Sequence, residues 1–163
     1  MRLVAFTAVL MLGMARATSA LAASADEEAI LAIERAMAAS NTTAAATAAW
    51  DDNVILDDML TMQPKQAQFV GLEAARKAWD PQFAAYTYSV ETLRIKVKSD
   101  GKLGFAWSTL HATAVGKNGQ PPLDIVFRQA TAYEKKDNQW KVIYLNLSVP
   151  FDSATNKAVF DGQ

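Results

Sequence analysis

The chain has 163 residues, of which 51% are hydrophobic and 20% are charged, a size and composition that suit one globular domain with its own hydrophobic core. It contains no cysteine, which excludes disulfide bonds, thiolate catalysis and cysteine-ligated metals. The formal net charge is only −1 and the basic residues form no cluster, so nucleic acid and anionic membrane surfaces are poor candidates for a partner.

The first residues have the pattern of a secretory signal peptide. Arg2 precedes an apolar run over residues 3–14, and Ala20-Leu21-Ala22 has the small-residue form of a cleavage site. The run is shorter than the roughly 20 residues that a spanning helix needs. We therefore predict a signal peptide over residues 1–22, cleaved near Ala22, and a mature domain over residues 23–163 in the periplasm or outside the cell.

Two helices and a strand are predicted next. Acidic residues at 26–28 followed by an apolar stripe of Ile30, Ile33 and Met37 indicate a helix over residues 26–40. The alanine-rich segment 44–50 predicts a second, shorter helix. Residues 51–53, Asp-Asp-Asn, are typical of a turn, and residues 54–60 predict a strand that becomes polar at Asp57 and Asp58.

The remainder alternates between one helix and four strands. Residues 69–71 are expected to be extended, and residues 72–85 predict a helix that Pro81 should kink or end early. Period-two alternation predicts strands over residues 86–98, 103–115, 125–133 and 140–149, joined by turns at 99–102 and 135–139 and by a loop at 116–122. This order predicts an α+β fold, in which helices are segregated from a curved antiparallel sheet.

Four stretches carry a family resemblance: Trp50-Asp51-Asp52, residues 69–76, Arg128 and the ending at residues 140–152. In this order and spacing they resemble SnoaL-like proteins of the NTF2-like superfamily, to which ketosteroid isomerase also belongs. The resemblance implies a cone of about three helices and a curved sheet around an apolar pocket. It also implies a homodimer that forms through the outer face of the sheet.

The resemblance assigns a candidate catalytic base, but the positions of its two hydrogen-bond donors are occupied by other residue types. Proton transfer next to a carbonyl needs a carboxylate base and two donors for the enolate oxygen. Counted from Asp51-Asp52, Asp57 matches the isomerase base. The isomerase also has a tyrosine on the first helix and an acid on the penultimate strand, where this chain has no tyrosine and residues 129–131 are Gln-Ala-Thr. Many relatives have histidines where this chain has Tyr144 and Asn146.

Other candidates come from residue type and position. His111, the single histidine, lies on a predicted strand and is a candidate for a catalytic role or a structural hydrogen bond. Arg128 could bind an anionic group or pair with an acid. Trp79, Phe83, Trp107, Tyr144 and Asn146 are candidates for the pocket lining, although aromatic residues at this spacing are also ordinary core residues. No spacing supports a metal site, and no motif indicates a cofactor.

Three functions remain open on the sequence. The first is an exported domain that binds a small, largely apolar molecule in a cone-shaped pocket, with no assigned reaction. The second is an isomerase, cyclase or dehydratase that acts next to a carbonyl with Asp57 as base. The third is a non-catalytic interaction protein that uses its outer sheet face.

Overall fold

The computed structural model describes residues 24–58, 68–155 and 157–159, so the predicted signal peptide at 1–22 lies outside the described residues. The helices are α1 (Ala25–Ala38), α2 (Thr43–Ala46) and α3 (Leu72–Ala85). The strands are β1 (Trp50–Asp58), β2 (Gln68–Val70), β3 (Tyr86–Ser99), β4 (Leu103–Gly116), β5 (Leu123–Lys136), β6 (Gln139–Ser148), β7 (Phe151–Asp152) and β8 (Lys157–Ala158).

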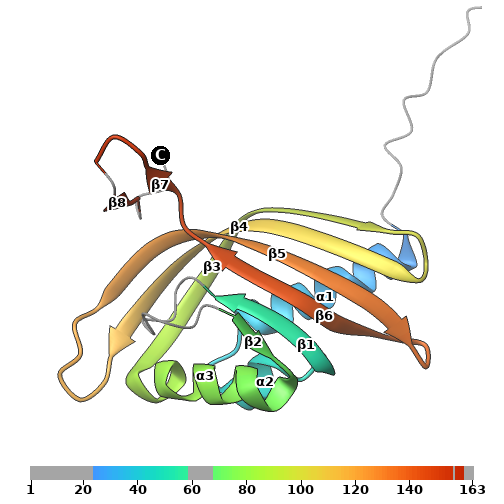
Figure 1. Ribbon diagram of the computed structural model, residues 1–163, viewed down its shortest axis with the longest axis horizontal. Coiled ribbons are helices and arrows are strands. Elements are labelled where there is room, and N and C mark those ends of the chain that lie inside the picture. Colours follow the sequence, from blue (N-terminus) through green and yellow to red (C-terminus); the bar gives the residue numbers. More distant parts are fainter. Residues whose placement is uncertain (1–23, 59–67, 156, 160–163) are drawn as a thin grey trace, which may run out of the picture.

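Six strands form one curved sheet in the order β2-β1-β6-β5-β4-β3, and β7 pairs with β8 in a separate ribbon. Strands β3 to β6 are an antiparallel meander, as predicted, and the three helices lie on the concave side of the sheet (Figure 1). This arrangement confirms the α+β class. The sheet is mixed rather than antiparallel throughout, because β1 inserts between β2 and β6 and runs parallel to β6.

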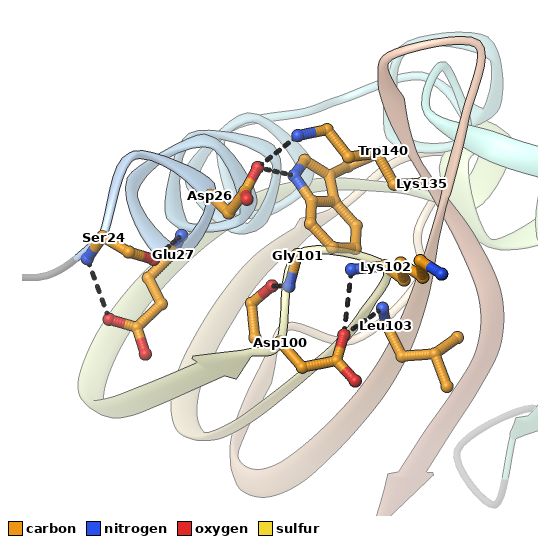
Figure 2. Close-up of polar contacts among 10 residues, drawn as sticks. Ser24, Asp26, Glu27, Asp100, Gly101, Lys102, Leu103, Lys135 and Trp140 are labelled. Atoms are coloured by element: carbon orange, nitrogen blue, oxygen red, sulfur yellow. Dashed lines mark hydrogen bonds and ion pairs between the residues drawn. The ribbon is translucent and has the colours of Figure 1, made fainter.

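Helix α1 is fixed to the sheet at its first turn. Ser24 and Glu27 form a capping box, each side chain accepting a hydrogen bond from the other residue's backbone N–H at 3.1 Å. Figure 2 shows Asp26 beside Trp140 and Lys135, and its Oδ1 accepts hydrogen bonds from Lys135 Nζ at 2.6 Å and from the Trp140 indole N–H at 3.0 Å. The hydrogen bond from Lys135 is the main reason why the pKa of Asp26 lies below its usual value. These contacts tie α1 to the β5–β6 hairpin.

The first strand differs from its prediction. It begins at Trp50 rather than after a turn, and the predicted second helix is only four residues long. The register with β6 jumps from Trp50 opposite Val142 to Ile55 opposite Tyr144, so residues 51–54 of β1 stand opposite the single residue Ile143 and form a bulge. Within the bulge Asp51 accepts a hydrogen bond from the Asn53 backbone N–H at 3.0 Å, a bond typical of turns. Residues 51–53 therefore form the predicted turn-like hydrogen bond, but they lie within strand β1 instead of before it.

Helix α3 has the predicted bounds and does not end early at Pro81. Side chains on either side of the proline pack against other elements: Trp79 meets Trp50 at 4.9 Å between ring centroids, and Phe83 meets Tyr88 at 5.7 Å. We infer that this packing offsets the hydrogen bond that proline cannot donate.

Strand β6 also contains an irregularity, which decides which of its residues face the core. Tyr133 of β5 lies opposite Val142, whereas Ala132 lies opposite Tyr144, so Ile143 is an extra residue on β6. Before it the even-numbered residue Val142 is buried, and after it the odd-numbered residues Leu145 and Leu147 are buried. Tyr144 is therefore turned away from the core.

Candidate functional site

A cavity of about 800 Å³ lies between the concave face of the sheet and the helices. Its wall is largely apolar and comes from α1, α3 and strands β3 to β6, with Met37, Val90, Leu110, Ala112, Leu145 and Leu147 among the lining side chains. Because β4 alternates strictly between exposed and buried residues, its small residues face inward and leave room for the cavity. This volume and lining are typical of a site for a small molecule.

Asp58 places a carboxylate in the cavity wall. Along β1 the inward residues are Val54, Leu56 and Asp58, which are 0%, 0% and 3% exposed. The Trp79 indole N–H donates a hydrogen bond of 2.7 Å to Asp58 Oδ2. A carboxylate buried in this way has a fixed orientation and can accept a proton or a hydrogen bond from a molecule in the cavity.

Aromatic side chains continue from Trp79 along the wall. The ring centroids of Trp79 and Phe83 are 6.1 Å apart, those of Phe83 and Tyr88 5.7 Å, and those of Tyr88 and Tyr86 5.9 Å. Burial, followed by the charges of Tyr86 and Asp58, raises the pKa of Tyr88 to about 12. The Tyr88 phenol is therefore neutral near pH 7 and serves as a hydrogen-bonding group.

A second carboxyl group, Glu34 of α1, also lines the cavity and is only 5% exposed. Its Oε1 accepts a hydrogen bond of 2.6 Å from the Tyr133 hydroxyl, and its Oε2 accepts one of 2.7 Å from Gln129 Nε2. Burial raises the pKa of Glu34, and the hydrogen bonds from Tyr133, Thr131 and Gln129 oppose that rise only in part. The cavity thus has two polar regions in its wall, one at Asp58 and one at Glu34.

Two of the predicted pocket residues, Trp79 and Phe83, line the cavity. The predicted base Asp57 is not among the lining residues. Its Oδ2 accepts a hydrogen bond of 2.7 Å from the Tyr144 hydroxyl, and its Oδ1 accepts one of 2.8 Å from Gln68 Nε2. Asp57 and Tyr144 therefore meet on the outer face of the sheet, because successive residues of a strand point to opposite faces and Asp58 points inward.

Trp107, Asn146, His111 and Arg128 are also absent from the lining residues. Asp57, Asn146, Ala130 and Trp107 are cross-strand neighbours, and such neighbours share a face, so Asn146 and Trp107 lie on the outer side with Asp57. Arg128 is exposed on β5. His111 is two positions from the outward Thr109 and Thr113, and its Nε2 lies 2.7 Å from Asp124 Oδ1. The structure therefore does not bring these residues together with Trp79 and Phe83.

The cavity residues that sequence reasoning missed had a signal in the pattern. Glu34 lies four residues after Ile30 and three before Met37, on the apolar stripe of α1. Asp58 follows Val54 and Leu56 at period two, so the alternation of β1 itself assigns it to the buried face. Tyr86 and Tyr88 were placed on a strand but were not singled out as lining residues.

Across residues 24–58, 68–155 and 157–159, no group of three or more histidine, aspartate or glutamate side chains is arranged to hold a metal ion. In the same part of the chain, no helix has the length and apolar character needed to cross a membrane.

A curved mixed sheet with three helices on its concave side defines an α+β fold, and a mainly apolar cavity lies between the two layers. A model of the SnoaL-like domain matches residues 27–152, and the chain belongs to this family. No curated protein matches the sequence.

Solved structures show the same fold at low sequence identity. An NTF2-like protein of unknown function from Pseudomonas putida KT2440 is 22% identical, with 85% of this chain and 96% of that chain covered and a TM-score of 0.72. The LinA-type3 hexachlorocyclohexane dehydrochlorinase from Novosphingobium barchaimii LL02 is 13% identical over 76% and 85% of the two chains, with a TM-score of 0.62. A candidate ketosteroid isomerase from Parabacteroides distasonis ATCC 8503 is 22% identical over 75% and 86%, with a TM-score of 0.56. The predicted resemblance to NTF2-like proteins is thereby confirmed.

Proposed function

We propose that this SnoaL-like domain binds a small, largely apolar molecule in the cavity. The observation that carries the proposal is the cavity itself, about 800 Å³ in volume and lined mainly by apolar side chains. Protein interiors are normally close-packed, so a space of this size in the middle of a domain suits a ligand better than a structural role. The signal-peptide pattern of residues 1–22 supports the further proposal that the domain is exported.

Filling the cavity should abolish binding without unfolding the protein. Ala112 is 4% exposed and lines the cavity, so the ring in Ala112→Phe would occupy ligand space. We expect ligands found by native mass spectrometry and thermal shift to lose at least tenfold in affinity, about 1.4 kcal/mol. The neighbouring Thr113→Phe places the same ring on the exposed side of β4 and should leave affinity unchanged. Equal affinities for both variants would contradict the proposed site.

A second candidate function is proton transfer next to a carbonyl, with Asp58 rather than Asp57 as the base. Its support is that Asp58 is a buried carboxylate in the cavity wall, oriented by Trp79, while Asp57 lies outside the cavity. The solved structures of similar fold include a dehydrochlorinase and a candidate isomerase, which is compatible with such chemistry.

This candidate predicts that the protein accelerates exchange of the α-hydrogens of a bicyclic ketone such as β-tetralone in D2O, followed by proton NMR. General-base catalysis typically contributes about 10²- to 10⁴-fold, so Asp58→Asn should reduce the acceleration by at least a hundredfold. Asp57→Asn should leave it intact. If the wild-type protein gives no acceleration, the binding function remains and the enzymatic one is excluded for this class of ketone.

We also propose that the outer sheet face pairs with a second copy of the chain. Phe105 and Trp107 are each 42% exposed there, with ring centroids 5.7 Å apart, and Ile55 adds a further exposed apolar side chain. Such a patch on a sheet face is typical of an interaction surface. The same patch would suit the interaction-protein alternative, but the cavity does not fit its requirement for a filled core.

Replacing Trp107 with Glu should shift the protein from dimer to monomer in sedimentation-velocity experiments, because an exposed apolar contact becomes a charge facing its own copy. Val115→Glu, which changes a side chain that is 71% exposed at the far end of β4, serves as the control. A wild-type protein that is monomeric at high micromolar concentration would contradict the dimer.

A further inference from the structure

The polar region of the cavity at Glu34 is held together by the protein itself. Glu34 of α1 accepts hydrogen bonds from the Tyr133 hydroxyl at 2.6 Å and from Gln129 Nε2 at 2.7 Å, and Thr131 adds a third. Each oxygen of a carboxyl group keeps a lone pair whether the group is ionised or neutral, so these contacts do not require a particular charge on Glu34. The acceptor capacity of Glu34 is therefore largely used within the domain.

These contacts fix the orientation of the Gln129 side-chain amide. Its Nε2 donates one hydrogen bond to Glu34 Oε2 at 2.7 Å and another to Thr131 Oγ1 at 3.3 Å. Both N–H groups of the amide are thereby engaged, whereas no residue in the described part of the chain donates a hydrogen bond to its Oε1. Gln129 lines the cavity. Its side chain therefore offers a ligand an acceptor and no donor.

Apolar side chains adjoin Gln129 on the cavity wall. It lies opposite Leu147 of β6 in the sheet register, and Phe127 is the next inward residue of β5; both line the cavity. On its other side, Ser108 Oγ is buried without a hydrogen-bond partner among the described residues, so the domain does not pair every polar atom here. A ligand that fills the cavity removes water from Gln129 Oε1, and a buried acceptor without a partner is destabilising. The ligand must therefore bring a donor.

Among small polar groups, a hydroxyl fits this position best. Ketones, ethers and carboxylates present only acceptors, which would face the acceptor of Gln129. An ammonium group brings three donors to one free amide oxygen, and it loses a strong hydration shell when it enters an apolar cavity. A hydroxyl group donates one hydrogen bond and carries no charge, so it pairs with the amide oxygen at a smaller desolvation cost.

Building on the proposed binding function, we propose that the ligand is an uncharged alcohol or phenol, an apolar body whose hydroxyl group donates a hydrogen bond to Gln129 Oε1. Glu34 acts as a positioning residue, because it holds the amide in the orientation that turns both N–H groups away from the ligand. The apolar body lies over Leu110 and Phe127. Gln129 thus selects the ligand by its hydrogen-bond donor rather than by charge.

A matched pair of probes tests the donor preference. 2-Tetralol and β-tetralone share one carbon skeleton, but the alcohol donates a hydrogen bond and the ketone only accepts. Isothermal titration calorimetry should show the alcohol binding at least fivefold more tightly, a difference of about 1 kcal/mol, as expected for one hydrogen bond. Equal affinities, or tighter binding of the ketone, overturn the inference and leave the binding function standing. Absence of binding by both probes contradicts both proposals.

Two glutamine variants locate the effect. Gln129→Met keeps the length of the side chain and removes the amide, so the preference for the alcohol should fall below twofold. Gln139→Met makes the same change at an exposed position and should leave the preference intact. A preference that survives Gln129→Met assigns the selection to another group and overturns the role of Gln129. If that variant does not fold, a crystal structure with 2-tetralol decides, since the hydroxyl must lie within hydrogen-bond distance of Gln129 Oε1.

Discussion

Replacing Leu56 with Ala should lower the free energy of unfolding by about 3 kcal/mol, measured by urea denaturation. Leu56 is 0% exposed and pairs with Leu145, which is also 0% exposed, in the β1–β6 register. Removing it eliminates buried apolar area and leaves a void that the surrounding strands can close only in part. The effect should be large because β1 and β6 are both interior strands of the sheet, each with a strand on either side.

Ile55→Ala is the matched control, since it changes the adjacent residue on the same strand. Ile55 is 36% exposed on the outer face, so its replacement should cost less than about 1 kcal/mol. The pair tests which residues of β1 face inward, on which the assignment of Asp58 rather than Asp57 to the cavity depends. Equal costs for the two variants would contradict this assignment, and a larger cost for Ile55→Ala would show that it is reversed.

Replacing Glu34 with Gln should remove a loss of folding stability that the wild-type protein shows as the pH rises. Burial raises the pKa of Glu34 above its ordinary value of 4.5, so the folded protein holds the proton of this carboxyl group more tightly than the unfolded chain does. The contribution of Glu34 to stability is therefore fully present below pH 4.5 and declines as pH rises through the folded-state pKa. The loss is about 1.4 kcal/mol for each unit by which folding raises the pKa.

Thermal unfolding of wild type and Glu34→Gln between pH 4 and pH 8 measures this effect. The variant should gain stability relative to wild type as the pH rises, because a glutamine can still accept the hydrogen bond from Tyr133 but carries no charge to desolvate. Glu28→Gln, on the exposed side of the same helix, should show no such trend. A wild-type advantage that grows with pH would contradict the raised pKa of Glu34.

The meander and the long helices were predictable from sequence because their signals are local. The alternation over residues 103–115 and the polar turn before Gln139 were sufficient for β4 and the β5–β6 hairpin, and the predicted bounds of α3 are those of the structure. The turn itself has Asp137 and Asn138 at positive φ, 47° and 62°, a conformation that these residue types tolerate well. The parallel partner of β1 has no local signal, because it lies almost ninety positions away in the chain.

The site was harder to predict because the family resemblance and the strand alternation point to different residues. Counting positions from Asp51 led to Asp57, whereas the buried residues of β1 are Trp50, Val54, Leu56 and Asp58, so its alternation leads to Asp58. On β6 the extra residue Ile143 moves the buried positions from Val142 to Leu145 and Leu147, which leaves Tyr144 turned away from the core. A one-residue bulge shifts every later side chain to the opposite face, and no pattern of residue types marked this one.

Trp107 shows a further limit of sequence reasoning. Its strand was predicted with the correct alternation, but the inward face was taken to be the aromatic one. In the structure, the alanines and Ser108 face inward, and because these side chains are small they leave the volume that the cavity occupies. The larger residues of β4 are left on the outer face, where Trp107 is 42% exposed.

The measurement that tests the central claim most directly is a crystal structure of the protein grown with a ligand found by native mass spectrometry and thermal shift. Our account predicts ligand density inside the cavity, in contact with Trp79, Phe83 and Leu110, with Asp58 facing it and Asp57 on the opposite side of the sheet. A cavity that is closed by its own side chains, or density found only on the outer face near Trp107, would contradict the account.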